Sequence, residues 1–418
     1  MAIHVYTGPS CPEPAVRAEC PGAVVHPPAR HGDLYSAAIR PHDSVVLLDG
    51  VYHHGPALRH KEILDALDRG VHVVGAASIG ALRAVELAPF GMVGVGDVYG
   101  WYRDGVLTGD DEVAVAHADS GAMTPLSVPL VNLRAAAAAA VRAGVLASAD
   151  TGPMLDRWAR EYYPLRTETR VVEIAAEHGQ PGFAAWYQER VRCDPRAFDQ
   201  KLRDSVRALR VASAAQRDRA AAGPRPGAGD RSWRTEFERR WRNRFTGLAA
   251  RLAYQQIFDP GFPEVWWEYL NDLAEPAGLR DHLERTLGRS AAAWPDCPEG
   301  RLRVVRLLCP TPELTDRRQA ALLLGREDAA DRSVLDQYLA QGADHLRAHP
   351  DRSLGSIPDA VCLRLLAGIW GVVAADATEC ARRGFASPRQ AADALRPFAV
   401  GFLTAAAAAA RSAGGERG

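Results

Sequence analysis

The sequence contains almost no lysine. Of its 50 basic residues only Lys61 and Lys201 are lysines, and all the others are arginines. The 51 acidic residues balance them, so the formal net charge is −1. Because there is no surplus of positive charge to attract nucleic acid or an anionic membrane, we expect neither as the main partner. A lysine kept in such a chain is a weak hint that its amine has a task a guanidinium cannot perform.

Long hydrophobic runs and metal motifs are missing too. No stretch reaches about 18 uninterrupted apolar residues, and a strand-like segment begins at Ile3 where a secretory signal would lie. The 7 cysteines are scattered without a CxxC pair, which argues against a disulfide framework and a zinc site. The HExxH and GxxxxGK[ST] motifs are also absent. We therefore expect a cytoplasmic protein with no metal and no cofactor of its own.

Short apolar runs alternate with helical patterns in the first third of the chain. Two segments have helical spacing, Leu58–Arg69 and Ile79–Leu87. The predicted strands are Ile3–Thr7, Val45–Leu48, Val71–Val74, Met92–Val95 and Val113–His117. This alternation predicts an α/β fold with a mostly parallel, Rossmann-like N-terminal sheet.

The composition changes from about Ala135 onward, where alanine, arginine and leucine recur with helical spacing and predict a mainly α-helical C-terminal region. The glycine- and proline-rich segment Arg219–Arg231 is the best candidate for a linker. The segment Ser232–Phe258 predicts one long amphipathic helix. The expected parts are an α/β domain over 1–134, a helical domain over 135–222, a helical C-terminal domain over 231–411 and a tail over 412–418.

Polar residues and glycines follow the predicted strands. Gly8 and Ser10 come after the first strand, Asp49 and Gly50 after the second, and Ser78 after the third. Ligands of doubly wound sheets bind beyond the carboxyl ends of the strands, so these residues are candidates for substrate binding. The alternative is that they are ordinary turn residues, since turns are rich in Gly, Asp and Ser.

Ser78 is the sharpest candidate for a nucleophile. The segment VHVVGAASIGALRAVEL reads as a strand, a tight turn and a helix, with Ser78 at the corner. This order is typical of a nucleophile elbow, although Ala-Ala-Ser-Ile-Gly replaces G-x-S-x-G. The N–H of Ile79, at the start of the helix, is placed to stabilise an oxyanion. Equally, serine is a favoured residue for capping a helix N-terminus.

A nucleophilic serine needs a base, and three residues of the same domain are candidates. Lys61 lies on the helix before the Ser78 strand, His53 follows the second strand, and His117 ends the predicted strand over Val113–His117. Histidine needs little tuning because its ordinary pKa is near neutrality. We favour Lys61, since an arginine stays protonated and could not replace it. It equally suits an exposed helical turn.

Five sequence blocks resemble, in order and spacing, the core of the TfuA-like family. They are HGDLYSA (His31–Ala37), LLDGVYHHGPALRHKEILDALDRGV (Leu47–Val71), GAASIGALRAVEL (Gly75–Leu87), FGMVGVGDVYGWYRDG (Phe90–Gly105) and DDEVAVAHA (Asp110–Ala118). The resemblance implies work beside a YcaO protein in the backbone thioamidation of a ribosomally made precursor peptide. It further implies that the YcaO partner consumes ATP, while the TfuA-like partner supplies sulfur from a small carrier protein with a C-terminal thiocarboxylate.

Cleavage of a thiocarboxylate is acyl transfer, which requires a nucleophile, a base and an oxyanion hole. Under this interpretation the protein is a serine hydrolase, in which Ser78, Lys61 or His117, and the N–H of Ile79 fill these roles. The rival hypothesis is a scaffold without catalysis that recruits the YcaO protein, the peptide or the carrier.

Overall fold

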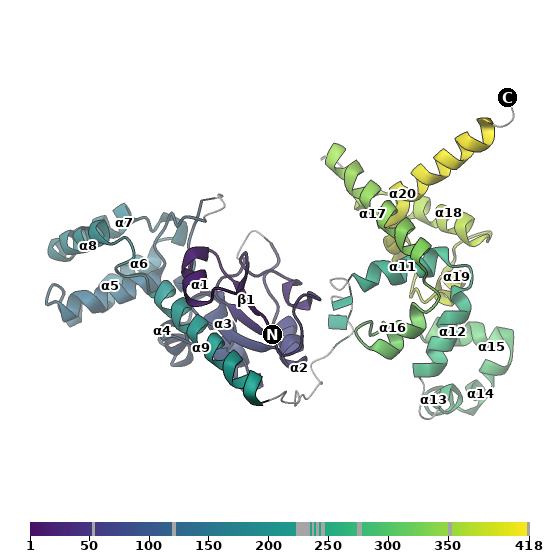
Figure 1. Ribbon diagram of the computed structural model, residues 1–418, viewed down its shortest axis with the longest axis horizontal. Coiled ribbons are helices and arrows are strands. Elements are labelled where there is room, and N and C mark those ends of the chain that lie inside the picture. Colours follow the sequence, from purple (N-terminus) through teal and green to yellow (C-terminus); the bar gives the residue numbers. More distant parts are fainter. Residues whose placement is uncertain are drawn as a thin grey trace. The chain divides into compact units, whose positions relative to one another are not determined.

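The computed structural model describes residues 1–51, 55–118, 123–222, 235, 238, 239, 242, 243, 247–273, 278–349 and 353–415. Its contacts divide the chain into two compact units, 1–234 and 235–418 (Figure 1). In the part of the chain that is described, no helix combines the length and the apolar character needed to cross a membrane.

Unit 1 is built on a sheet of five parallel strands in the order β2-β1-β3-β4-β5. The strands are β1 (Ile3–Tyr6), β2 (Val24–His26), β3 (Ser44–Leu47), β4 (His72–Gly75) and β5 (Val93–Gly94). The predicted class, a parallel N-terminal sheet followed by a mainly helical region, is therefore confirmed. Only β2 lacks a sequence signal, because it is three residues long and its first residue, Val24, is exposed.

Helices cover both faces of the sheet. They are α1 (Glu13–Glu19), α2 (His60–Asp68), α3 (Ile79–Leu87), α4 (Asp97–Arg103) and α9 (Gln200–Ala222). On one face α1 and α9 contribute Val16 and Leu209 to a core shared with Val5 of β1. On the other face Ile63 of α2 packs with Leu47 of β3. With both faces covered, the strands read as continuous apolar runs.

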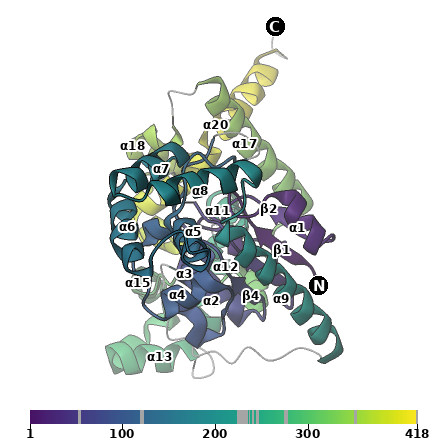
Figure 2. The same cartoon turned by 90° about the vertical axis from the view of Figure 1, so that its left-hand side faces the viewer.

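Helix α9 comes from the segment that the sequence assigns to a separate helical domain, yet it packs directly on the sheet (Figure 2). Its first turn lies near the carboxyl end of β3, since Lys201 approaches Asp49 there. Toward its other end Gln216 donates a hydrogen bond to the carbonyl of Met1. The helix therefore runs antiparallel to the strands and spans the length of the sheet.

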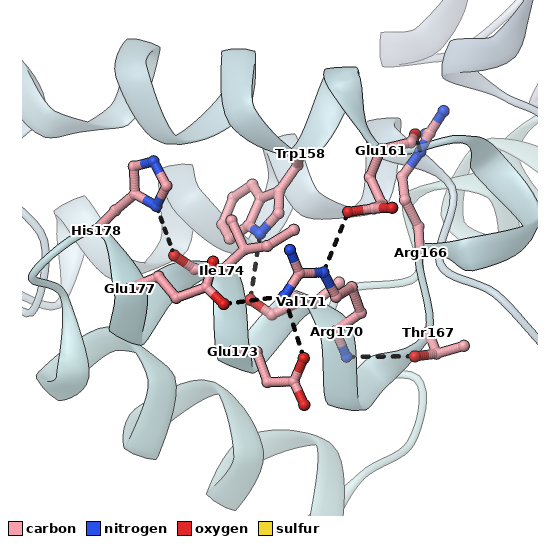
Figure 3. Close-up of polar contacts among 10 residues, drawn as sticks. All are labelled: Trp158, Glu161, Arg166, Thr167, Arg170, Val171, Glu173, Ile174, Glu177 and His178. Atoms are coloured by element: carbon pink, nitrogen blue, oxygen red, sulfur yellow. Dashed lines mark hydrogen bonds and ion pairs between the residues drawn. The ribbon is translucent and has the colours of Figure 1, made fainter.

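Four further helices of unit 1 pack around the buried side chains of Trp158 and Phe183. They are α5 (Leu130–Arg142), α6 (Ser148–Arg160), α7 (Glu168–Glu177) and α8 (Pro181–Cys193). Arg170 of α7 pairs with Glu161 just after α6, and the indole of Trp158 donates to the carbonyl of Val171 (Figure 3). The arginine pair is partly exposed and adds little, so the buried aromatic core holds these helices together.

The predicted strand over Val113–His117 is wrong. The short helix η3 (Asp110–Glu112) precedes it, and His117 forms only an isolated antiparallel bridge with Pro125. Beside this bridge the N–H of Ala116 donates to the hydroxyl of Ser127 at 2.9 Å instead of to the facing backbone, so the ladder does not continue. The other short helices of this unit are η1 (Asp33–Tyr35), η2 (Ala88–Phe90) and η4 (Tyr163–Leu165).

Unit 2 is helical in its described residues. Its helices are α11 (Leu248–Phe258), α12 (Phe262–Leu273), α13 (Gly278–Leu287), α14 (Arg289–Ala292), α15 (Pro298–Leu307), α16 (Arg317–Leu323), α17 (Ala329–Ala348), α18 (Asp359–Trp370), α19 (Ala377–Arg382) and α20 (Pro388–Gly415), with η5 (Trp294–Asp296) and η6 (Leu354–Ser356) between them. A single helix over Ser232–Phe258 is wrong, because Gly247 has φ +75° and α11 begins after it. Helix α20 also extends into the predicted tail.

Candidate functional site

The order of the strands places a crevice beyond the carboxyl ends of β1 and β3. The chain moves from β1 outward to β2 and then returns to the other side of β1 for β3. Connections leave such a pair in opposite directions, which opens a binding crevice at this switch point. Gly8 and Ser10 follow β1, and Asp49 and Gly50 follow β3. The structure therefore brings these four predicted residues together.

Asp49 is the centre of this group. Its carboxylate accepts hydrogen bonds from the N–H groups of Gly8 (2.8 Å) and Ser10 (2.9 Å) and from the hydroxyl of Ser10 (2.6 Å). The side chain is buried, and these three donors compensate for the loss of water. Asp49 thus fixes the loop after β1 against the end of β3.

Lys201 completes the group from α9 and is the site residue that sequence reasoning missed. Its Nζ lies 3.8 Å from Oδ1 of Asp49 and donates to the carbonyl of Val113 at 2.8 Å. Burial lowers the pKa of Lys201, against the opposing effect of Asp49 and Asp199. The available signal was that only two lysines occur in the chain. Which of the two lysines reaches the crevice depends on where α9 packs, and the helical spacing of the sequence does not predict the position of that helix.

A cavity of about 110 Å³ lies beside Lys201. Ser10, Lys201 and Asn132 give it a polar lining, and Tyr187 of α8 and Phe198 line its apolar side. The cavity therefore lies between the switch point and the helices α5, α7 and α8, all within unit 1.

Ser78 stands at a strained turn between β4 and α3. Ala77 has φ +65°, and the N–H of Ser78 donates to the carbonyl of Ala76 at 2.7 Å. A hydrogen bond across three residues with a positive central φ is the rare, strained form of the γ-turn. The Ser78 side chain makes no hydrogen bond that caps α3, so the capping explanation is not what the geometry shows. Strain of this kind concentrates at functional sites.

The turn at Ser78 is pressed against the end of β3. A Cβ on Gly80 would lie 1.8 Å from the carbonyl oxygen of Leu47, and a Cβ on Gly50 would lie 2.6 Å from Cγ2 of Ile79. The Ser78 turn and the Asp49 loop are therefore in direct contact. Ile79 is the first residue of α3, where N–H groups have no acceptor inside the helix.

The candidate bases Lys61 and His117 lie on different elements from Ser78. Lys61 is the second residue of α2 and is half-buried, while the His60 ring beside it lies 2.7 Å from the carboxylate of Glu86 on α3. His117 is exposed, and its Nδ1 lies 3.1 Å from the carbonyl of Ala118. His53 lies outside the described residues.

In a comparison with known protein families, the model of TfuA-like protein matches residues 49–167. The matched segment contains Asp49, Lys61, Ser78 and His117 but only the last two strands of the sheet, and Lys201 lies outside it. No curated protein matches the chain.

Proposed function

Since the chain carries a TfuA-like region over residues 49–167, we propose that it is the accessory protein of a YcaO enzyme in backbone thioamidation of a ribosomally made peptide. In this role it delivers sulfur by hydrolysing the C-terminal thiocarboxylate of a small carrier protein. The YcaO partner binds ATP and activates the amide, so thioamide forms only when both proteins are present.

The proposed cleavage proceeds in two balanced steps. Ser78 Oγ attacks the thiocarboxylate carbon, a C–O bond forms, the C–S bond breaks, and the serine proton leaves with sulfur as hydrosulfide. Water then hydrolyses the acyl-serine, which returns Ser78 and leaves an ordinary carboxylate on the carrier. The N–H of Ile79 is placed to stabilise the oxyanion of each tetrahedral intermediate.

The observation that carries this proposal is the strained turn at Ser78. A serine that only capped a helix would need neither the positive φ of Ala77 nor the close approach of Gly80 to β3. This geometry supports the proposal because it fixes the backbone of Ser78 at the carboxyl end of β4, in contact with the end of β3. Lys61, His53 and His117 are the bases that the sequence proposes, and variants of Lys61 and His117 are included in the test below.

The first prediction concerns Ser78. Ser78→Ala removes one oxygen and should abolish sulfide release from a thiocarboxylated carrier, with an unchanged melting temperature and unchanged carrier binding. Ser78→Cys should keep part of the activity, because a thiol is also a nucleophile. Ser148→Ala, at an exposed serine of α6, is the matched control and should behave as wild type. Sulfide measured over time checks all three.

The rival scaffold hypothesis gives the opposite result. A protein that only recruits the YcaO enzyme, the peptide or the carrier would support thioamidation equally well with Ser78→Ala. Full activity of that variant, together with full activity of Lys61→Arg and His117→Ala, would establish the scaffold role. If Lys61→Arg is inactive and His117→Ala active, Lys61 is required as an amine, because arginine stays protonated.

A further inference from the structure

A buried histidine–glutamate pair lies apart from the residues discussed so far. Glu62 is fully buried in the first turn of α2. One of its carboxylate oxygens is 2.5 Å from Nδ1 of His31 and accepts from the N–H of Arg59 at 3.2 Å. The other accepts from the N–H of Gly32 at 2.7 Å. A carboxylate held on both oxygens fixes the orientation and the tautomer of the imidazole, as in enzymes that use a histidine base.

The segment that carries His31 meets the segment that carries Ser78. Ala29, two residues before His31, forms a parallel bridge with Gly50 at the carboxyl end of the sheet. A Cβ on Gly50 would lie 3.1 Å from the Ala29 oxygen and 2.6 Å from Cγ2 of Ile79. Gly50 is therefore the point where both segments touch. The His31 side chain is 14% exposed, whereas that of Glu62 is fully buried.

We infer that His31 is the general base of the Ser78 reaction and that Glu62 is the residue that positions it. The inference rests on the proposed function. With the Nδ1 proton donated to Glu62, the lone pair of His31 is on Nε2. Nε2 takes the proton of Ser78 as the new C–O bond forms, and it returns that proton to the sulfur as the C–S bond breaks. Protons and electrons balance without any other reactant.

Several titratable groups surround this pair. Burial raises the pKa of Glu62, despite its hydrogen bonds to His31 and to two N–H groups. Tyr6 of β1 lies close enough to Glu62 to interact with its charge. The pKa of the Tyr6 phenol is raised, mainly by burial and then by the charges of Asp33 and Glu62. Arg59, the residue before α2, and Lys61 of α2 lie just before Glu62 in the sequence. The pH profile of the reaction therefore has to be compared between variants rather than assigned from the wild type alone.

The test measures sulfide release by the full chain from a carrier protein that ends in a glycyl thiocarboxylate, across a range of pH. His31→Gln should lower kcat/KM by about 10²–10⁴-fold, the usual contribution of a general base. Wild-type kcat/KM should fall toward acid pH, because protonated His31 cannot accept the serine proton. Glu62→Gln removes the charge that stabilises the imidazolium, so this acid limb should move to lower pH and the maximum should fall. A purely structural Glu62 would change the melting temperature without moving the limb.

A matched control lies on the same helix. His60 also pairs with a glutamate, Glu86, but these side chains are 46% and 43% exposed, so His60→Gln should leave kcat/KM and the pH profile unchanged. In His31→Ala, added imidazole should restore part of the lost rate, which loss of folding would not permit.

The outcomes separate this inference from the proposed function. Full activity of His31→Gln alongside inactive Ser78→Ala overturns the inference and leaves the proposed function intact. Full activity of Ser78→Ala overturns both. If His31→Gln does not fold, the pH profile of Glu62→Gln decides instead. If kcat/KM of that variant falls at the same acid pH as in the wild type, the assignment of His31 and Glu62 is rejected.

Discussion

The backbone at Ala77 adopts a positive φ although alanine carries a Cβ. A left-handed conformation costs an L-residue about 1–2 kcal/mol, and glycine avoids that cost. At the same time a glycine increases the entropy of the unfolded chain, which lowers the free energy of unfolding by about 0.4–1 kcal/mol. The difference between these two effects determines what a glycine does at this position.

We expect Ala77→Gly to leave the free energy of unfolding unchanged or to raise it by up to about 1 kcal/mol, because the relief of strain matches or exceeds the entropy cost. Ala84→Gly is the control, since Ala84 is equally buried but lies inside α3, where glycine costs about 1 kcal/mol. Chemical denaturation of both variants measures the difference. An equal loss in the two would mean that the turn at Ala77 is not strained.

The positions of single site residues were predictable where they directly follow a predicted strand. Ser10, Asp49 and Ser78 all follow predicted strands, and the structure places them at one edge of the sheet. Lys201 and the pair of His31 with Glu62 were not predicted as site residues. Their partners are distant in sequence, and the contacts depend on how a helix or a loop packs, which a local pattern does not record.

At the scale of elements, the contact between α3 and β3 depends on a missing side chain. Gly80 lies in the first turn of α3, and a Cβ there would meet the backbone of Leu47, which cannot rotate away as a side chain can. The helix and the strand therefore approach more closely than any other residue at position 80 would allow.

Gly80→Ala should accordingly destabilise the protein by about 1–3 kcal/mol, the usual cost of overpacking, or prevent folding. The matched change is Gly100→Ala in α4, where a Cβ would meet no atom within 4 Å. There we expect a gain of about 0.5–1 kcal/mol, because alanine favours a helix interior over glycine. Melting temperatures would contradict this account if both substitutions shifted them in the same direction.

Elements with a strong period were predictable, and those that depend on a partner were not. The helix over Ile79–Leu87 was predicted with its observed bounds, and four strands were found within a residue or two. The segment over Val113–His117 alternates like a strand, but the N–H of Ala116 bonds to the Ser127 hydroxyl instead of to a facing strand. The assignment of α9 to the sheet required knowledge of tertiary contacts.

At the scale of the whole molecule, the TfuA-like segment is smaller than the structure that supports it. Residues 49–167 contain β4 and β5, whereas β1, β2, β3 and α9 lie outside. The segment alone lacks the strands of the switch point and the helix that covers one face of the sheet.

A fragment of residues 49–167 should therefore show no cooperative thermal transition, while residues 1–234, which form one compact unit, should unfold cooperatively. Circular dichroism during heating distinguishes the two. A cooperative transition in the short fragment would show that β4 and β5 need neither α9 nor the central strands.

The position of α9 also affects how the protein is made. All five strands emerge from the ribosome well before residues 200–222, so the sheet face that α9 covers has no partner at first. At roughly 5–20 residues per second, translation of the intervening helices keeps this apolar face open for seconds. During that time the nascent chain is a natural client for a chaperone. The polar centre at Asp49 is completed only when Lys201 arrives, so a nascent chain that ends before α9 carries no finished site.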